Sequence, residues 1–149
     1  MCTKEKFDLY EKYQKVVHKS PGNSIGGYKS FLCNSPLYDP QSTTDSKMSH
    51  VDSHKDDART IKDEGVFPEV LGSYHMLHRI DGELAMVGVL DITDTCVSSV
   101  YLYYDPKWEF LSPGHLSAIR EIEYVRKCMT LGAPETFHYY YMGLYFQNC

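Results

Sequence analysis

Residues 96–130 predict a strand, a tight corner and a capped helix in immediate succession. The segment 96–104, CVSSVYLYY, is rich in β-branched and aromatic side chains, which suit a pleated, half-buried surface. Pro106 then ends the strand, because proline cannot donate to a ladder of hydrogen bonds. We expect Ser112 to be the N-cap of the next helix and Pro113 its first residue. Apolar residues then recur at three- and four-residue steps: Leu116, Ile119, Ile122, Val125 and Met129.

The start of this helix is the first candidate site. A helix start that faces the end of a strand gathers free backbone N–H groups, which bind anions and polarised carbonyl oxygens. We therefore expect the turn around Ser112 and Gly114 to stabilise an oxyanion, as the sites of acyltransferases do.

The first half of the chain predicts one helix and one hairpin. Residues 4–18 place apolar side chains on one broad helical face, which indicates a helix packed on a core. Residues 73–80 and 83–93 read as two strands joined by Asp81-Gly82, a pair that favours the positive φ angles of a tight turn. The consecutive apolar residues from Leu84 to Leu90 predict a central strand that is covered on both faces.

Residues 137–146 predict a last strand, so the order is helix, three-stranded meander, helix, strand. This order predicts an α+β sandwich, a mainly antiparallel sheet flanked by helices. It matches the N-acetyltransferase-like (GNAT-like) core, in which the last two strands splay apart to admit substrate. The sequence by itself also allows other α+β sandwiches.

The composition fits one globular domain, residues 1–149. The chain is 42% hydrophobic and 23% charged, and its longest apolar run is far shorter than the roughly 20 residues that a membrane-spanning helix needs. The first residues lack the apolar core of a secretion signal, so we expect a cytoplasmic or nuclear location and no membrane partner. The net charge of -5 argues against a large nucleic-acid surface within this domain.

Two features predict little chemistry of their own. The five cysteines are scattered and lack C-x-x-C spacing, so we expect reduced thiols and no metal site. Residues 38–66 are polar and acidic without an apolar period, which predicts a flexible loop. His50 and His54 stand beside aspartates in this loop, where a surface metal site is the alternative to a solvated segment.

Several long motifs resemble a known family. They are SSVYLYYDP, the FLS-x-G turn, SAIREI, HYYYMG, LYEKYQKVVH, FLCNSPL and DGELAMVGVLDI. Together they resemble the carboxy-terminal domain of arginyl-tRNA–protein transferases, which move arginine from tRNA onto protein N-termini. The resemblance covers nearly all of the chain outside residues 38–66. It implies the GNAT-like fold, arginyl-tRNA as donor, acceptor proteins with acidic N-terminal residues and a role in the N-degron pathway.

The chain departs from the family pattern in three ways. It has no cysteine-rich segment and stops at YFQNC, so we expect one domain of a longer enzyme or a shortened form of it, with a missing amino-terminal domain as partner. Residues 72–78 read GSYHMLH where the family usually has GSFHQQY, which puts acceptor recognition in question. The alternatives are a leucyl/phenylalanyl-type transferase and a catalytically incomplete binding domain.

The start of the second helix also lacks the basic, glycine-rich segment that binds the pyrophosphate of coenzyme A. Only Gly114 is present, so we expect no coenzyme A and no other cofactor in this domain.

Transfer of arginine from an aminoacyl ester needs a carboxylate that binds the guanidinium of the donor arginine and a cation that binds the acidic side chain of the acceptor. It also needs a hydrogen-bond donor for the oxyanion of the tetrahedral intermediate and a group that accepts one proton. Asp91 at the end of the central strand is our first choice for the guanidinium, and Glu121 is the second. We predict four catalytic residues: Asp91, Tyr103, Ser112 and His18. We predict eight substrate-binding residues: Tyr13, Gln14, Ser73, His75, Tyr104, Gly114, Arg120 and Glu121.

Overall fold

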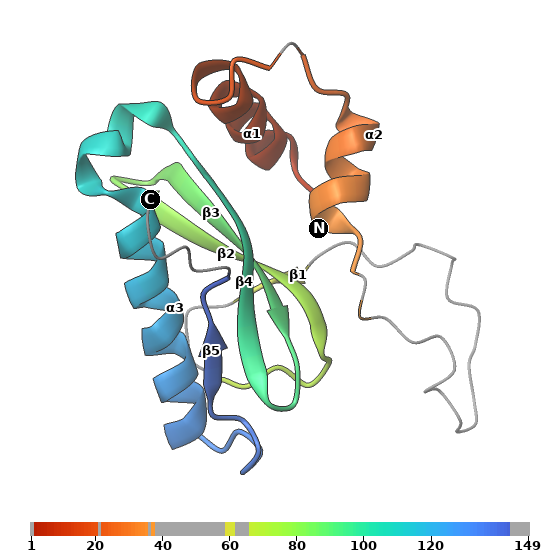
Figure 1. Ribbon diagram of the computed structural model, residues 1–149, viewed down its shortest axis with the longest axis vertical. Coiled ribbons are helices and arrows are strands. Elements are labelled where there is room, and N and C mark those ends of the chain that lie inside the picture. Colours follow the sequence, from red (N-terminus) through yellow and green to blue (C-terminus); the bar gives the residue numbers. More distant parts are fainter. Residues whose placement is uncertain (1, 21, 36, 38–58, 62–65, 144–149) are drawn as a thin grey trace.

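Helices cover both faces of a five-stranded sheet (Figure 1). The computed structural model describes residues 2–20, 22–35, 37, 59–61 and 66–143. Its elements are α1 (Lys4–Val16), α2 (Ile25–Tyr28), the π-helix η1 (Lys29–Cys33), β1 (Arg59–Thr60), β2 (Gly72–Ile80), β3 (Glu83–Ile92), β4 (Cys96–Tyr104), the 3-10 helix η2 (Pro106–Leu111), α3 (Pro113–Thr130) and β5 (Tyr139–Tyr141).

The predicted order of helix, three-stranded meander, helix and strand is confirmed. The sheet order is β1-β2-β3-β4-β5, with antiparallel pairing within the β2-β3-β4 meander and parallel pairing of the two outer strands. The fold is therefore α+β with a mixed open sheet, compatible with a GNAT-like core. β4 pairs with β5 only through residues 96–98, so the outer edge of β4 from Ser99 onward has no strand partner in the described chain.

The hairpin and the central strand form as their sequences predict. Asp81 and Gly82 have φ angles of 51° and 83°, the positive values that a tight antiparallel turn requires. Every residue from Leu84 to Leu90 is buried, because α1 covers one face of β3 and α3 covers the other.

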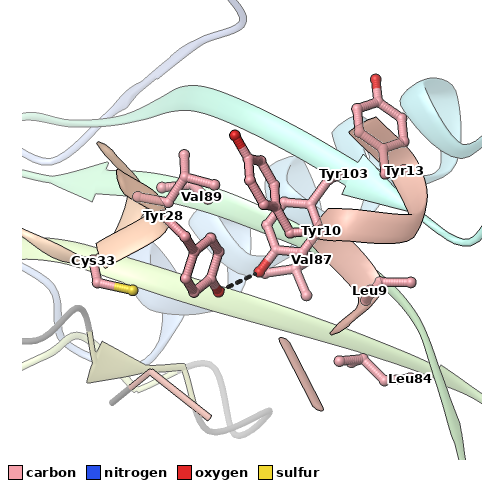
Figure 2. Close-up of a cluster of buried hydrophobic side chains, with 10 residues drawn as sticks. Leu9, Tyr10, Tyr13, Tyr28, Cys33, Leu84, Val87, Val89 and Tyr103 are labelled. Atoms are coloured by element: carbon pink, nitrogen blue, oxygen red, sulfur yellow. Dashed lines mark hydrogen bonds between the residues drawn. The ribbon is translucent and has the colours of Figure 1, made fainter. Parts of the chain in front are cut away.

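The core on the α1 face is aromatic (Figure 2). Tyr10 of α1 and Tyr28 of α2 pack with Tyr103 of β4, with ring centroids 5.1 to 6.3 Å apart. The hydroxyl oxygens of Tyr28 and Tyr103 lie 2.9 Å apart and form the hydrogen bond drawn in Figure 2. This bond satisfies two polar atoms that would otherwise be costly to bury.

Some local predictions are wrong. Ser112 is at the N-cap of α3 and Pro113 is its first residue, as predicted, but Ser112 has φ 51° and its side chain makes no capping bond. α1 ends at Val16, and β5 spans only Tyr139–Tyr141. Arg59–Thr60 forms a short strand inside the predicted loop. Residues 38–58, which include His50 and His54, lie outside the described residues.

The cysteines also differ from expectation. Cys2 and Cys33 are joined by a disulfide that links the segment before α1 to the end of η1. Cys96 and Cys128 are free thiols, as expected, and Cys149 lies outside the described residues. None of the described helices is long and apolar enough to span a membrane.

The packing of α3 on the sheet depends on a glycine. A Cβ at Gly88 would lie 2.9 Å from Glu121 Oε1 and 3.3 Å from Ser117 Oγ. Glu121 is only 1% exposed, and hydrogen bonds from Ser117 and Tyr140 hold its carboxylate in place. A side chain at position 88 would therefore have to displace this buried, hydrogen-bonded carboxylate.

We expect Gly88→Ala to lower the free energy of unfolding by about 1–3 kcal/mol through overpacking. The matched control is Gly114→Ala, because no atom lies within 4 Å of a Cβ at that position of α3. Chemical denaturation monitored by circular dichroism measures both changes. Equal midpoints for the two variants would contradict the tight contact between α3 and β3.

Candidate functional site

Asp91 and Ser73 form the most distinctive polar pair on the α1 face of the sheet. They are direct partners in the β2-β3 ladder, so both side chains point to the same face. The Ser73 hydroxyl donates to Asp91 Oδ1 over 2.6 Å, and the Ser73 N–H donates to Ser35 Oγ over 3.1 Å. Asp91 is partly exposed and forms no ion pair with any described residue. The result is an oriented carboxylate that can accept an external cation.

An aromatic surface adjoins this pair. Tyr101 is the ladder partner of Val89, which lies two residues before Asp91 on the same face. The Tyr101 hydroxyl accepts a hydrogen bond of 2.9 Å from Gln14 Nε2. The ring of Phe31, which is 60% exposed, lies 5.4 Å from that of Tyr101. The Tyr101 ring is therefore on the same face of the sheet as the Asp91 carboxylate, with the Phe31 ring against it, and the buried Gln14 amide holds the Tyr101 hydroxyl.

The carboxyl end of α1 extends the aromatic surface. The ring of Tyr13 lies 4.9 Å from that of Tyr104 and 5.2 Å from that of His18. His18 itself is exposed. The structure therefore brings four predicted site residues together with Tyr101: Tyr13, Gln14, His18 and Tyr104.

Two residues of this region, Ser35 and Phe31, are absent from the predicted site. A signal for them exists in the sequence. Phe31 and Ser35 belong to the FLCNSPL block and Tyr101 to SSVYLYYDP, both of which resemble the family. The period of a strand alone does not say which of the β4 tyrosines is accessible.

Tyr103 and His75 lie inside the core. Tyr103 is fully buried, and burial raises its pKa far above the ordinary value of a tyrosine. His75 is also fully buried, with Nε2 2.8 Å from the Leu32 carbonyl and Nδ1 3.2 Å from Lys6 Nζ. A carbonyl oxygen can only accept, so Nε2 carries a proton and donates it to Leu32. Both side chains join layers of the fold here, and their catalytic and binding roles stay predictions.

Glu121 lies on the opposite face of the sheet from Asp91. Its carboxylate packs on Gly88, three residues before Asp91 in a strand whose side chains alternate between faces. The Tyr140 hydroxyl donates to Glu121 Oε2 over 2.7 Å, and burial together with this bond raises the Tyr140 pKa. Asp91 and Glu121 therefore cannot be alternative ligands of one guanidinium in one pocket.

The start of α3 offers fewer free donors than its sequence predicts. The Ser112 N–H donates to the Glu109 carbonyl, and the His115 N–H donates to the Ser112 carbonyl. Proline has no N–H, so the Gly114 N–H alone lacks an acceptor among the described residues.

This turn is also far from Asp91. Asp91 pairs with Ser98, whereas α3 follows the other end of β4 at Tyr104. Ser98 and Tyr104 are six residue steps apart along the strand, about 20 Å at 3.3 Å per residue. The structure therefore does not bring Ser112 and Asp91 to the same reacting atoms.

Arg120 is exposed on α3 and pairs with Glu123 over 3.1 Å. It lines a cavity of about 260 Å³ on the α3 face, together with Met76 and His78. All three positions that depart from the family pattern, Met76, Leu77 and His78, therefore contribute to the lining of this cavity. Leu77 also packs against the aromatic core on the other face of the sheet.

We expect Tyr13 to make folding stability sensitive to alkaline pH. Burial, with the nearby Tyr101 and Tyr104, raises the pKa of Tyr13 to about 12. The unfolded chain ionises Tyr13 near its ordinary pKa of about 10, so the stabilisation is complete below that pH and is lost as the pH rises through 12. Denaturation at a series of alkaline pH values measures the slope. Tyr13→Phe should reduce the slope of the unfolding free energy against pH. The control Tyr139→Phe removes a largely exposed hydroxyl and should leave this slope unchanged. Equal slopes in the two variants would contradict the raised pKa of Tyr13.

Comparison with known proteins finds relatives that align with nearly the whole chain. The sequence is 39% identical to arginyl-tRNA–protein transferase 1 of Arabidopsis thaliana, over 97% of this chain and 20% of that protein. It is 32% identical to arginyl-tRNA–protein transferase 1 of Dictyostelium discoideum, over 99% of this chain and 33% of that protein. An aspartate/glutamate leucyltransferase of Campylobacter jejuni is 29% identical over 51% of this chain and 29% of that protein. The chain therefore spans a third or less of the length of these relatives.

The family described as "Arginine-tRNA-protein transferase, C terminus" matches residues 5–149, which run from the first turn of α1 through β5. The match contains both the Ser73–Asp91 pair and the aromatic surface beside it. This chain belongs to the arginine-tRNA-protein transferase family, in the part that forms its C terminus.

Proposed function

We propose that this domain takes part in the transfer of arginine from arginyl-tRNA to the N-terminal α-amine of acceptor proteins that begin with an acidic residue. The observation that carries the proposal is the Asp91 carboxylate. The Ser73 hydroxyl orients it, no described cation neutralises it, and it is partly exposed on the face that carries the aromatic surface.

A guanidinium fits this carboxylate well. The two oxygens of a carboxylate match the fork of N–H donors in arginine, and such charge-assisted pairs are about twice as strong as neutral hydrogen bonds. Ser73 donates to Oδ1 only, which leaves lone pairs on both oxygens for a donor arginine. Partial burial strengthens the attraction, because the surroundings screen the charges less than bulk water does.

The neighbouring aromatic surface fits the other end of the donor. The arginine of arginyl-tRNA is esterified to a terminal adenosine, and bases stack well on aromatic side chains. The exposed ring of Phe31 and the ring of Tyr101 provide such a platform on the same face of the sheet as Asp91. The site would thus bind the two ends of the aminoacyl adenosine and hold the ester between them.

The transfer reaction itself needs few catalytic groups from the protein. The ester is already activated, so the acceptor amine attacks its carbonyl carbon, the ribose oxygen leaves and the amine loses one proton. No serine or cysteine nucleophile is needed. His18 is our candidate for accepting the proton, because it is exposed and lies in ring contact with Tyr13 at the border of the surface.

The same proposal excludes acetyl-coenzyme A as donor. A pyrophosphate needs several converging backbone N–H groups or a cation, and the start of α3 presents the Gly114 N–H alone among its first donors. We therefore propose an aminoacyl-tRNA as the donor and no cofactor in this domain.

Leucine transfer is the second candidate, because the Campylobacter relative is named as a leucyltransferase. The two reactions differ in the donor pocket. An isolated carboxylate attracts a guanidinium and is costly to bury against an apolar leucine side chain. Asp91 therefore favours arginine.

We expect Asp91→Asn to weaken binding and transfer of arginine while the fold stays intact. The amide keeps the shape of the side chain and removes the charged pair, which costs on the order of 100-fold. Calorimetry with a stable amide analogue of 3′-arginyl adenosine measures binding, and transfer from arginyl-tRNA to a peptide with an N-terminal aspartate measures activity. The matched control is Asp94→Asn in the β3-β4 turn, which removes an exposed carboxylate three residues away.

Unchanged binding and transfer in Asp91→Asn would contradict the assignment of Asp91. Faster transfer from leucyl-tRNA than from arginyl-tRNA would favour the leucyltransferase. Tight binding of the analogue without transfer from either donor would indicate a binding domain.

A further inference from the structure

We propose that the cavity between α3 and the β2-β3 hairpin binds an acidic segment of the acceptor polypeptide, with one apolar side chain inside the cavity. The identity of this peptide as an acceptor rests on the proposed function. The cavity itself lies on the α3 face of the sheet, opposite the Ser73–Asp91 pair, so it is a second contact for the acceptor and separate from the reacting atoms.

The floor of the cavity is apolar and adaptable. It contains Met76 of β2, Met86 of β3, and Leu116 and Tyr124 of α3. Met76 and Met86 are 9% and 0% exposed, and neither belongs to the α1-face core. Methionine side chains are flexible and polarisable, so they adapt to apolar groups of different shapes. Such a floor suits the side chains of many different acceptors.

The rim of the cavity carries a surplus of positive charge. Arg120 and Lys127 share the single carboxylate of Glu123, at 3.1 and 3.4 Å. Arg79 is paired with Glu5 through two hydrogen bonds of 2.8 Å. Two cations against one carboxylate leave one net positive charge, so an incoming carboxylate can bind the free donors of Arg120.

The size of the cavity selects the class of ligand. Its volume of about 260 Å³ is below the range of roughly 300–1,000 Å³ that is typical of pockets for whole small molecules. It is large enough for one or two amino-acid side chains. A nucleic acid fits less well, because its phosphates would meet Glu123 on the rim and a chain with a net charge of -5.

The position of the cavity predicts a dependence on acceptor length. A polypeptide that starts near Asp91 must pass around the sheet edge to reach the α3 face. Five residue steps of β3, about 17 Å, separate Asp91 from Met86, and the layer spacing adds about 10 Å, so at about 3.3 Å per residue this path is at least about eight residues long. Short acceptors cannot reach the cavity, whereas acceptors of about ten residues can.

The direct test uses a labelled ten-residue peptide that has an N-terminal aspartate and an Asp-Leu pair near its carboxyl end. Methyl NMR of the intact chain with labelled methionines should show shifts for Met76 and Met86 on addition of the peptide. Met129 and Met142, which are exposed elsewhere, should not shift. Arg120→Glu should weaken binding on the order of tenfold, because it replaces a charge-assisted pair by repulsion.

The matched control for this variant is Arg126→Glu, which makes the same charge change on the same helix at a residue that does not line the cavity. It should bind the peptide within about twofold of the original chain. The absence of Met76 and Met86 shifts at about 1 mM peptide, or equal affinity in Arg120→Glu, would overturn the proposal. Displacement of the peptide by a single-stranded oligonucleotide, with loss of that displacement in Arg120→Glu, would assign the cavity to RNA instead.

Transfer kinetics separate this proposal from the proposed function. Arg120→Glu should raise KM for the ten-residue acceptor about tenfold more than it raises KM for an aspartyl dipeptide amide. An equal effect on both acceptors would place Arg120 at the reacting end and overturn the second contact. If the peptide shifts the Met76 and Met86 signals but no arginine is transferred, the proposed function is contradicted and the peptide site in the cavity is not.

Discussion

The burial of β3 on both faces is the constraint on which the rest of the structure depends. From Leu84 to Leu90 this strand has no exposed residue, so each face must be covered by a separate helical layer. α1 and α2 supply the aromatic layer on one side, and α3 supplies the other (Figure 1). Gly88 sets how closely α3 approaches, because the Glu121 carboxylate takes the space that a side chain would fill.

The sheet around this central strand also places the two proposed binding sites on opposite faces. Side chains of successive strand residues point to opposite faces, so the polar residues of the two faces cannot share one pocket. Ser73, Asp91 and Tyr101 belong to the α1 face, whereas Met76, Met86 and Arg120 line the α3 face. A site for the aminoacyl donor and a separate contact for the acceptor polypeptide can thus exist in one small domain without competing for the same surface.

Two carboxylates illustrate how environment determines role. Glu121 is buried and accepts hydrogen bonds from Ser117 and Tyr140, so it joins α3 to β5 and has little contact with solvent. Asp91 is partly exposed, is oriented by one hydroxyl and has no cationic partner in the described chain. Both lie close to the central strand, yet only Asp91 is placed to bind an external cation.

The sequence by itself determined the elements whose signals are local. Asp81-Gly82 predicted the hairpin, the apolar run from Leu84 to Leu90 predicted the central strand, and the three- and four-residue steps after Pro113 predicted α3. Only the tertiary structure decided which side chains meet. It placed Asp91 beside Ser73 and Ser35, buried Tyr103 and His75, and separated Ser112 from Asp91 by the length of β4. The physical reason is that periodicity encodes the face of a residue within its own element, whereas contacts depend on the register between strands and on helices distant in sequence.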